Sequence, residues 1–243
     1  MKKFTLITFP NDVLLARAVA REWLDVVEKF SHDGRTQCVA LSGGRIAREF
    51  FNAVVEGARA RSISLAQVHF FWADERCVPP TDPESNFAVA DKLLFQPLAV
   101  PRENVHRIHG ESVPEEAVLA ANNELRHVVG ANGEGLPKLD LVFLGMGEDG
   151  HVASLFPGDT VSPDDSREIY RAVVAPKPPP HRITLTYGII AAARAVWVLA
   201  AGSGKEYALY QSLSGADSPP LARLLAMRKA TRIFTDIHAN PVT

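Results

Sequence analysis

The sequence contains very little cysteine: only Cys38 and Cys77 among 243 residues. Two cysteines cannot form a disulfide framework or a zinc site with four cysteine ligands, so we expect a protein of the reducing cytoplasm. Long apolar runs are missing as well. None approaches the roughly 18 uninterrupted apolar residues that suggest a transmembrane helix, so we expect no membrane partner.

A strong excess of charge of either sign is also absent, because 26 Lys and Arg residues face 28 Asp and Glu residues. The net charge of −2 favours neither nucleic acid nor an anionic membrane as a partner. A phosphorylated ligand would therefore need a local cluster of cations. The sequence also lacks the HExxH and CxxC spacings of metal sites and the GxSxG signature of a serine nucleophile. A hydrolase built from these residues would activate water directly, and we expect no metal or cofactor.

The sequence does contain a regular alternation of apolar, strand-like runs and helix-like segments. Residues 12–30 are the clearest helix, because Leu15, Val19 and Trp23 share one face. Nearly continuous apolar strands are typical of a parallel sheet covered on both faces. We therefore predict one α/β domain over residues 1–243, with a mainly parallel sheet and helices on both faces. The predicted strands are 4–9, 37–41, 68–73, 139–145, 182–186, 195–201 and 231–236, and the other predicted helices are 46–58, 86–95, 114–130 and one that follows Gly204.

Four of the predicted strands end in a polar or glycine-rich stretch. Parallel strands all end at the same edge of a sheet, and ligands of open α/β folds bind at that edge. We therefore expect the four stretches to converge on one site. They are Ser42-Gly43-Gly44-Arg45, Asp74-Glu75-Arg76, Gly145 to His151, and Gly202-Ser203-Gly204-Lys205.

The third stretch fits the GxGxxG pattern of dinucleotide-binding turns over residues 145–150. A dinucleotide turn needs a long helix after it, whose N-terminus faces the pyrophosphate. Pro157 and Gly158 would end any helix here after about two turns. Glu148 and Asp149 would also place negative charge against the phosphates. We therefore interpret Gly147 and its neighbours as a tight turn that lets the backbone approach a different ligand.

Asp149 and His151 are the candidate catalytic pair within this turn. A histidine accepts a proton near neutral pH, and a nearby carboxylate orients it. The spacing is equally compatible with a structural role, in which Asp149 caps a short helix and His151 lies in its first turn.

The segment LSGGR suits an anion, because Gly43 and Gly44 expose backbone N–H groups at a helix N-terminus and Ser42 adds a hydroxyl. An ordinary strand-to-helix turn is the equally compatible alternative. Arg182 and Lys205 would supply positive charge if they converge there, although each alone is typical of a surface cation.

The Asp74-Glu75-Arg76 run also has two interpretations. It is either a solvated charged segment or a polar group at the end of a strand that leaves the core.

Taken together, these motifs resemble the 6-phosphogluconolactonases. LGMGEDGHVASLFPG, residues 144–158, is similar to the family signature in which a glycine-rich loop runs into D-G-H-T-A-S-L-F-P-G. ALSGG, FFWADERCVPPTDPESNF, RITLT and GSGK match further blocks in the same order, and the resemblance covers about residues 4–236. It implies a sugar-phosphate-isomerase-like fold and hydrolysis of 6-phospho-D-glucono-1,5-lactone to 6-phosphogluconate in the oxidative pentose phosphate pathway.

Two alternatives stand beside this activity. The related glucosamine-6-phosphate deaminases continue H-I-A-F-N-E-P after the shared histidine and carry D-E-Y in the earlier block. This chain has Phe156 in place of their glutamate and Arg76 in place of their tyrosine, which favours the lactonase. A non-catalytic sugar-phosphate sensor on the same fold is the second alternative. The chain also departs from the lactonases, with Arg45-Ile46 for the usual Ser-Thr and Val152 for a threonine.

The resemblance implies a role for each candidate residue in a monomeric enzyme. His151 is the expected general base, Asp149 orients it or positions the sugar, and Arg76 offsets negative charge at the reacting carbonyl or holds the substrate. The expected contacts to the sugar phosphate come from Ser42, Gly43, Gly44, Arg45, Asp74, Gly147, Arg182 and Lys205.

Overall fold

The computed structural model describes residues 3–130, 135–159, 168–215 and 219–237. Within them, six strands form one parallel sheet in the order β1-β9-β8-β5-β2-β3. Its strands are β1 (Thr5–Thr8), β2 (Gln37–Leu41), β3 (Val68–Trp72), β5 (Leu141–Gly145), β8 (Ala195–Ala200) and β9 (Arg232–Thr235). The predicted parallel sheet is therefore confirmed.

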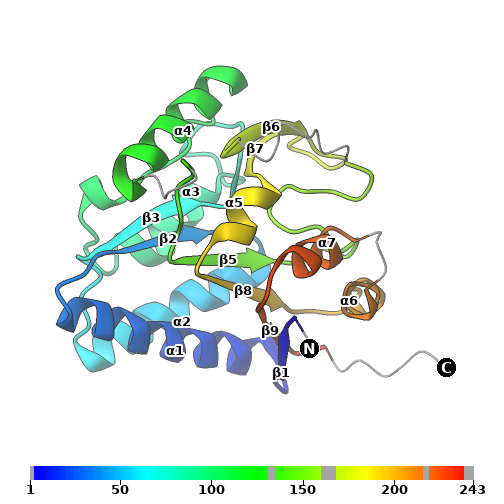
Figure 1. The fold of residues 1–243 in the computed structure, drawn as a ribbon. Coiled ribbons are helices and arrows are strands. Elements are labelled where there is room, and N and C mark those ends of the chain that lie inside the picture. The colour runs from blue at the N-terminus through cyan, green and yellow to red at the C-terminus, as the bar shows by residue number, and fades with distance from the viewer. Residues whose placement is uncertain (1–2, 131–134, 160–167, 216–218, 238–243) are drawn as a thin grey trace.

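Helices cover both faces of this sheet, as predicted. Figure 1 shows α1 (Asp12–His32) and α2 (Arg45–Arg61) side by side on one face, and α5 (Tyr187–Ala192) and α7 (Pro220–Met227) on the opposite face. Two further helices are α4 (Pro114–Val129) and α6 (Glu206–Ser214), the latter being the helix predicted after Gly204. The predicted helix 86–95 is present as α3 (Asn86–Ala90) and a π-helical turn, η1 (Asp91–Phe95). A short 3-10 turn, η2 (Arg102–Asn104), follows.

A cluster of aromatic rings joins α1 and α2 to the centre of the sheet. The Trp23 ring of α1 lies 5.5 Å from Phe143 of β5, 6.2 Å from Phe70 of β3 and 5.8 Å from Phe50 of α2. Each such pair contributes about 0.5–1.5 kcal/mol beyond its buried area. The Trp23 indole N–H donates to the Gln37 side chain at 3.1 Å, so its one polar atom is paired.

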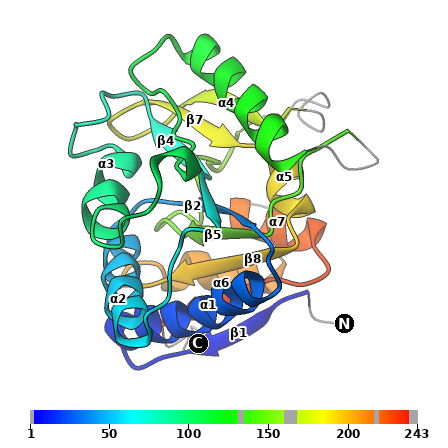
Figure 2. The ribbon, with the colours of Figure 1, turned by 90° about the vertical axis from the view of Figure 1, so that its left-hand side faces the viewer.

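A second, three-stranded antiparallel sheet, β4-β7-β6, lies at one end of the molecule beside α4 (Figure 2). It comprises β4 (Asp74–Arg76), β6 (Tyr170–Val174) and β7 (His181–Leu185). The predicted strand 182–186 belongs here and not to the parallel sheet, and β4 and β6 were not predicted. Such short strands form because distant segments pair, which local sequence periodicity does not record. No helix in the described part of the chain is long and apolar enough to cross a membrane.

Candidate active site

The carboxyl ends of β2, β3, β5 and β8 carry the four polar stretches, and a pocket of about 280 Å³ lies where they meet. The structure therefore brings together the segments that the parallel arrangement of the strands predicted to converge. Ten of the eleven predicted site residues line this pocket: Ser42, Gly43, Gly44, Arg45, Asp74, Arg76, Gly147, His151, Arg182 and Lys205. The eleventh, Asp149, lies behind His151.

A hydrogen bond joins the His151 ring to the Asp149 carboxylate. The His151 Nδ1 lies 2.5 Å from Asp149 Oδ1, and the same oxygen accepts the His151 backbone N–H at 3.1 Å. Burial alone would raise the pKa of Asp149, but the hydrogen bond and the charge of His151 outweigh it and lower that pKa to about 2. A carboxylate bonded to Nδ1 selects the tautomer with its proton on Nδ1, which leaves Nε2 as the basic atom.

The backbone around His151 forms tight turns and no helix. The Gly150 N–H donates to the Gly147 carbonyl at 3.1 Å, and Gly150 has a φ of +80°, a conformation that favours glycine. The alternative in which Asp149 caps a short helix is therefore wrong. Val152 is fully buried below this loop, so the residue that replaces the family's threonine contributes to packing.

Gly147 provides the space in which the imidazole lies. A Cβ atom at this position would be 2.1 Å from two ring atoms of His151 and 2.8 Å from Asp149 Oδ1. No real side chain tolerates such a contact. Gly147, the second glycine of the GxGxxG pattern, is therefore explained by the His151 ring packed against it.

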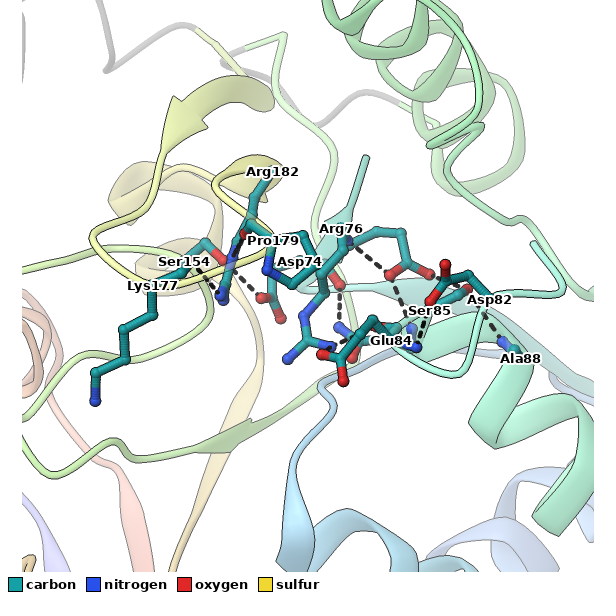
Figure 3. Close-up of polar contacts among 12 residues, drawn as sticks. Asp74, Arg76, Asp82, Glu84, Ser85, Ala88, Ser154, Lys177, Pro179 and Arg182 are labelled. Carbon is teal, nitrogen blue, oxygen red and sulfur yellow. Dashed lines mark hydrogen bonds and ion pairs between the residues drawn. The ribbon is translucent and has the colours of Figure 1, made fainter. Parts of the chain in front are cut away.

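Asp74 and Glu75 are buried, with 5% and 2% of their surface exposed, so they are not a solvated charged run. The Ser154 hydroxyl donates to Asp74 Oδ2 at 2.7 Å, which ties the loop of His151 to β4 (Figure 3). The Glu75 carboxylate accepts the backbone N–H groups of Asn86 and Phe87, both at 2.8 Å. Burial raises the pKa of Glu75, and these hydrogen bonds oppose the rise.

Arg76 projects into the pocket from the end of β4. Its Nη1 atom donates to the Glu84 backbone carbonyl (Figure 3). Its Nε–H is buried and has no hydrogen-bond partner among the described residues. A buried donor without a partner costs free energy, so the Arg76 side chain keeps unused hydrogen-bonding capacity beside the pocket.

Asn86 is a pocket residue that the sequence analysis missed. Its Nδ2 donates to the Asp74 carbonyl at 2.8 Å, and a Cβ on Gly43 would lie 1.9 Å from its Oδ1. Gly43 is therefore required by the close approach of Asn86 as well as by any ligand. The only sequence signal was the position of Asn86 in the block DPESNF, which the family resemblance included without a role.

The loop after β2 differs in one respect from the predicted anion site. The Ser42 hydroxyl donates to the Phe143 carbonyl at 3.0 Å, so its hydrogen joins β2 to β5 and does not point to a ligand. Gly44 has a φ of +100° and precedes the first residue of the 17-residue α2, whose N-terminus faces the pocket. The features of this loop that favour an anion are therefore its backbone N–H groups and the dipole of α2.

Arg45 and Lys205 supply positive charge on the same side of the pocket. Burial and the neighbouring Arg45 lower the pKa of Lys205, while Glu148 and Asp236 act in the opposite direction. The Arg45 guanidinium lies beside the Gly202 turn, 3.7 Å from where a Cβ on Gly202 would be. The two cations thus come from the loops after β2 and β8.

Arg182, at the start of β7, is held at a third side of the pocket. Its Nε donates to the Pro179 carbonyl at 3.0 Å and its Nη2 to the Lys177 carbonyl at 3.3 Å (Figure 3). Burial and the nearby Arg76 lower the pKa of Arg182, and Asp74 and Glu84 oppose that shift.

A second cavity, of about 450 Å³, lies between α4 and the segment 102–109. Carboxylates neutralise its cationic side chains, which makes it a poorer candidate for an anionic substrate despite its larger volume. The pairs are Arg102 with Asp91 at 2.7 Å and Arg107 with Glu111 at 2.6 Å.

Comparison with known proteins identifies the family of this chain. Residues 10–233 match the family model described as "Glucosamine-6-phosphate isomerases/6-phosphogluconolactonase". A 6-phosphogluconolactonase of Aggregatibacter actinomycetemcomitans is 34% identical over 235 residues, 95% of this chain and 96% of that protein. The crystal structure of devB protein is 31% identical, with a TM-score of 0.86 over 97% of this chain and 98% of that one.

The fold itself is shared more widely. A monomeric glucosamine-6-phosphate deaminase superposes with a TM-score of 0.80 at 16% identity, over 97% of each chain. The architecture therefore does not separate the two activities, and the site residues must do so. From the match over most of its length, this chain belongs to the glucosamine-6-phosphate isomerase/6-phosphogluconolactonase family.

Proposed function

We propose that this protein is a 6-phosphogluconolactonase, which hydrolyses 6-phospho-D-glucono-1,5-lactone to 6-phosphogluconate in the pentose phosphate pathway. The observation that carries the proposal is the His151–Asp149 pair at 2.5 Å, set in a pocket that Arg45, Arg76 and Lys205 also line. A base with a carboxylate partner and a group of cations suit an anionic ester. Phe156 stands where the deaminases place a catalytic glutamate, which disfavours that reaction.

The proposed chemistry uses water as the nucleophile. His151 Nε2 accepts a proton from water as the water oxygen bonds to the lactone carbonyl carbon. Arg76 stabilises the negative charge that develops on the carbonyl oxygen. The bond between the carbonyl carbon and the ring oxygen then breaks, and the proton held by His151 passes to that oxygen. The products are a hydroxyl and a carboxylic acid, which ionises in solvent.

The remaining pocket residues bind the rest of the substrate in this proposal. The phosphate lies against the backbone N–H groups of Gly43 and Gly44 and the cations Arg45 and Lys205. Arg182 adds a third cation. Asp74 and Asn86 present polar groups to the sugar hydroxyls.

Lactone hydrolysis at neutral pH tests this function. The lactone is generated in situ, and its spontaneous opening is subtracted. We expect a rate proportional to the protein concentration and no release of ammonia from glucosamine 6-phosphate. Folded protein that does not accelerate lactone opening would contradict the proposal, and ammonia release would indicate the deaminase reaction instead.

Replacing either cation of the proposed phosphate site should weaken substrate binding. We expect Arg45→Gln and Lys205→Gln to raise KM by about 10–100-fold with a smaller change in kcat, because charge-assisted hydrogen bonds are worth about 1.5–3 kcal/mol. Steady-state kinetics on the lactone measures both constants. Arg48→Gln, an exposed cation of α2 outside the pocket, is the matched control and should leave KM within about twofold. A fall in kcat at constant KM would place Arg45 or Lys205 at the transition state.

The lowered pKa of Lys205 predicts a pH dependence of binding. A lysine with a lowered pKa loses its proton at a lower pH than an ordinary lysine. The affinity for 6-phosphogluconate should therefore fall as the pH rises from 7, before the ordinary lysine range is reached. Calorimetric titration with 6-phosphogluconate measures this fall while the phosphate remains dianionic.

Lys205→Arg is the control for this pH dependence, because arginine keeps its charge throughout the range. The affinity of that variant should change little between about pH 7 and 10, where a lysine with a lowered pKa loses its proton. An equal decline in Lys205→Arg would assign the effect to another group.

The proposal also includes a monomeric enzyme that acts in the cytoplasm without a nucleic acid partner. The net charge of −2, which favours no nucleic acid partner, supports the last part of this proposal. Sedimentation at micromolar concentration tests the monomer, and a dimer would contradict it.

A further inference from the structure

Phe156 contacts both the proposed base and one of the substrate-binding cations. Its side chain is nearly buried, with 9% exposed. Its ring centroid lies 4.8 Å from that of His151, with 42° between the ring planes. The Arg182 guanidinium carbon lies 5.7 Å from the same centroid, within the range of a cation–π interaction.

The hydrogen bonds of His151 and Arg182 do not fully fix either group. Asp149 holds the His151 ring at Nδ1, but a single hydrogen bond leaves the ring free to tilt about that atom. The Pro179 and Lys177 carbonyls hold one edge of the Arg182 guanidinium and leave its face unsupported. Packing against an aromatic ring limits both remaining motions, because dispersion contacts are lost when either group tilts away.

The two groups come from separate parts of the fold. His151 belongs to the loop after β5 of the parallel sheet, and Arg182 is the second residue of β7 in the antiparallel sheet. Phe156 lies five residues after His151, also outside both sheets. Its ring contacts the Arg182 guanidinium of the antiparallel sheet. One ring therefore sets the position of each group relative to the other.

We propose that Phe156 is a positioning residue. Its ring packs against both the His151 base and the Arg182 cation and keeps the distance between them constant. The inference rests on the proposed function, since it assigns Phe156 a part in lactone hydrolysis. A constant distance between the base and the cation would match the distance between the reacting carbonyl and the anionic group of one substrate. A misplacement of about 1 Å in such a site is enough to cost about 10²-fold in rate.

Phe156→Leu is the test, because leucine keeps the apolar character and removes the ring face. We expect kcat to fall by about tenfold or more and KM for the lactone to rise, in protein whose circular dichroism is unchanged. We also expect the His151 ring-proton resonances, assigned by comparison with His151→Ala, to shift in the NMR spectrum as the ring current of Phe156 is lost. Phe156→Tyr, which restores an aromatic ring, should recover most of kcat.

Phe234→Leu is the matched control. Phe234 is fully buried in β9, with the Arg232 guanidinium 4.7 Å from its ring centroid and the Trp197 ring 5.4 Å away, yet β9 contributes no residue to the pocket. This variant should lower the melting temperature and leave kcat unchanged. Equal losses of kcat in both leucine variants would reduce the role of Phe156 to general core packing.

Two results overturn the proposal. One is a folded Phe156→Leu enzyme with kcat and KM within twofold of wild type, and the other is an unchanged His151 ring-proton position in that variant. Failure of the proposed function is distinguishable, because wild-type protein would then lack lactonase activity altogether. The NMR comparison would still report whether Phe156 packs against the imidazole.

Discussion

His151→Ala should lower kcat for lactone hydrolysis by about 10²–10⁴-fold, the range over which a positioned general base accelerates proton transfer. The imidazole is the group whose Nε2 remains basic after Asp149 occupies Nδ1, so its removal leaves water without a base. KM should change little, because Arg45, Lys205 and the glycine loop, which we propose bind the phosphate, are untouched. The measurement is steady-state kinetics with the spontaneous opening of the lactone subtracted.

Thermal unfolding provides the control for this variant. The His151 side chain is partly exposed and most of its contacts are within its own loop, so the melting temperature should stay close to that of the wild type. A folded His151→Ala protein with normal turnover would show that another group activates water. A large rise in KM at constant kcat would instead make His151 a substrate-binding residue.

Gly147→Ala should reduce kcat by about 10²-fold or more, although it adds only one methyl group. The new Cβ would lie 2.1 Å from the His151 Cε1 and Nδ1 atoms and 2.8 Å from Asp149 Oδ1, so the imidazole must leave its position. Displacement of a catalytic group by about 1 Å costs about this much. Kinetics should show the loss, and the His151 ring-proton resonances should move in the NMR spectrum.

Gly145→Ala is the matched control in the same segment. A Cβ there would meet only the Gly43 carbonyl oxygen at 3.6 Å, an ordinary contact. Its activity should stay within a few-fold of the wild type. If Gly147→Ala were as active as Gly145→Ala, the imidazole would not be held against Gly147 in the working enzyme.

The sequence by itself determined the parallel sheet and the edge at which the site forms. Apolar runs separated by amphipathic helices specify parallel strands, and parallel strands end on a common side. The polar stretches at residues 42–45, 74–76, 145–151 and 202–205 were therefore expected on one edge, and they meet there because β8, β5, β2 and β3 are neighbours in the sheet. The sequence also excluded a dinucleotide turn, because Pro157 prevents the long helix that such a turn requires.

Tertiary structure decided the features that depend on contacts between distant segments. The three-residue strand β4 exists because Asp74, Glu75 and Arg76 pair with β7, more than a hundred residues later, and no local periodicity marks so short and polar a strand. Asn86 reaches the pocket because the buried Glu75 carboxylate holds the start of α3. The pairing of β2 with β5 likewise places the Ser42 hydroxyl where it donates to the Phe143 carbonyl and not to a ligand.

The identity of each side chain's partner is likewise a property of the folded chain. Sequence spacing left two roles open for Asp149 and His151, and the turns around Gly150 exclude the one in which Asp149 caps a helix. Phe156 was noted only as the residue that replaces a glutamate, whereas the fold places its ring against His151 and Arg182. Local pattern specifies where a chain turns and which face is buried, and packing between segments decides which atoms then meet.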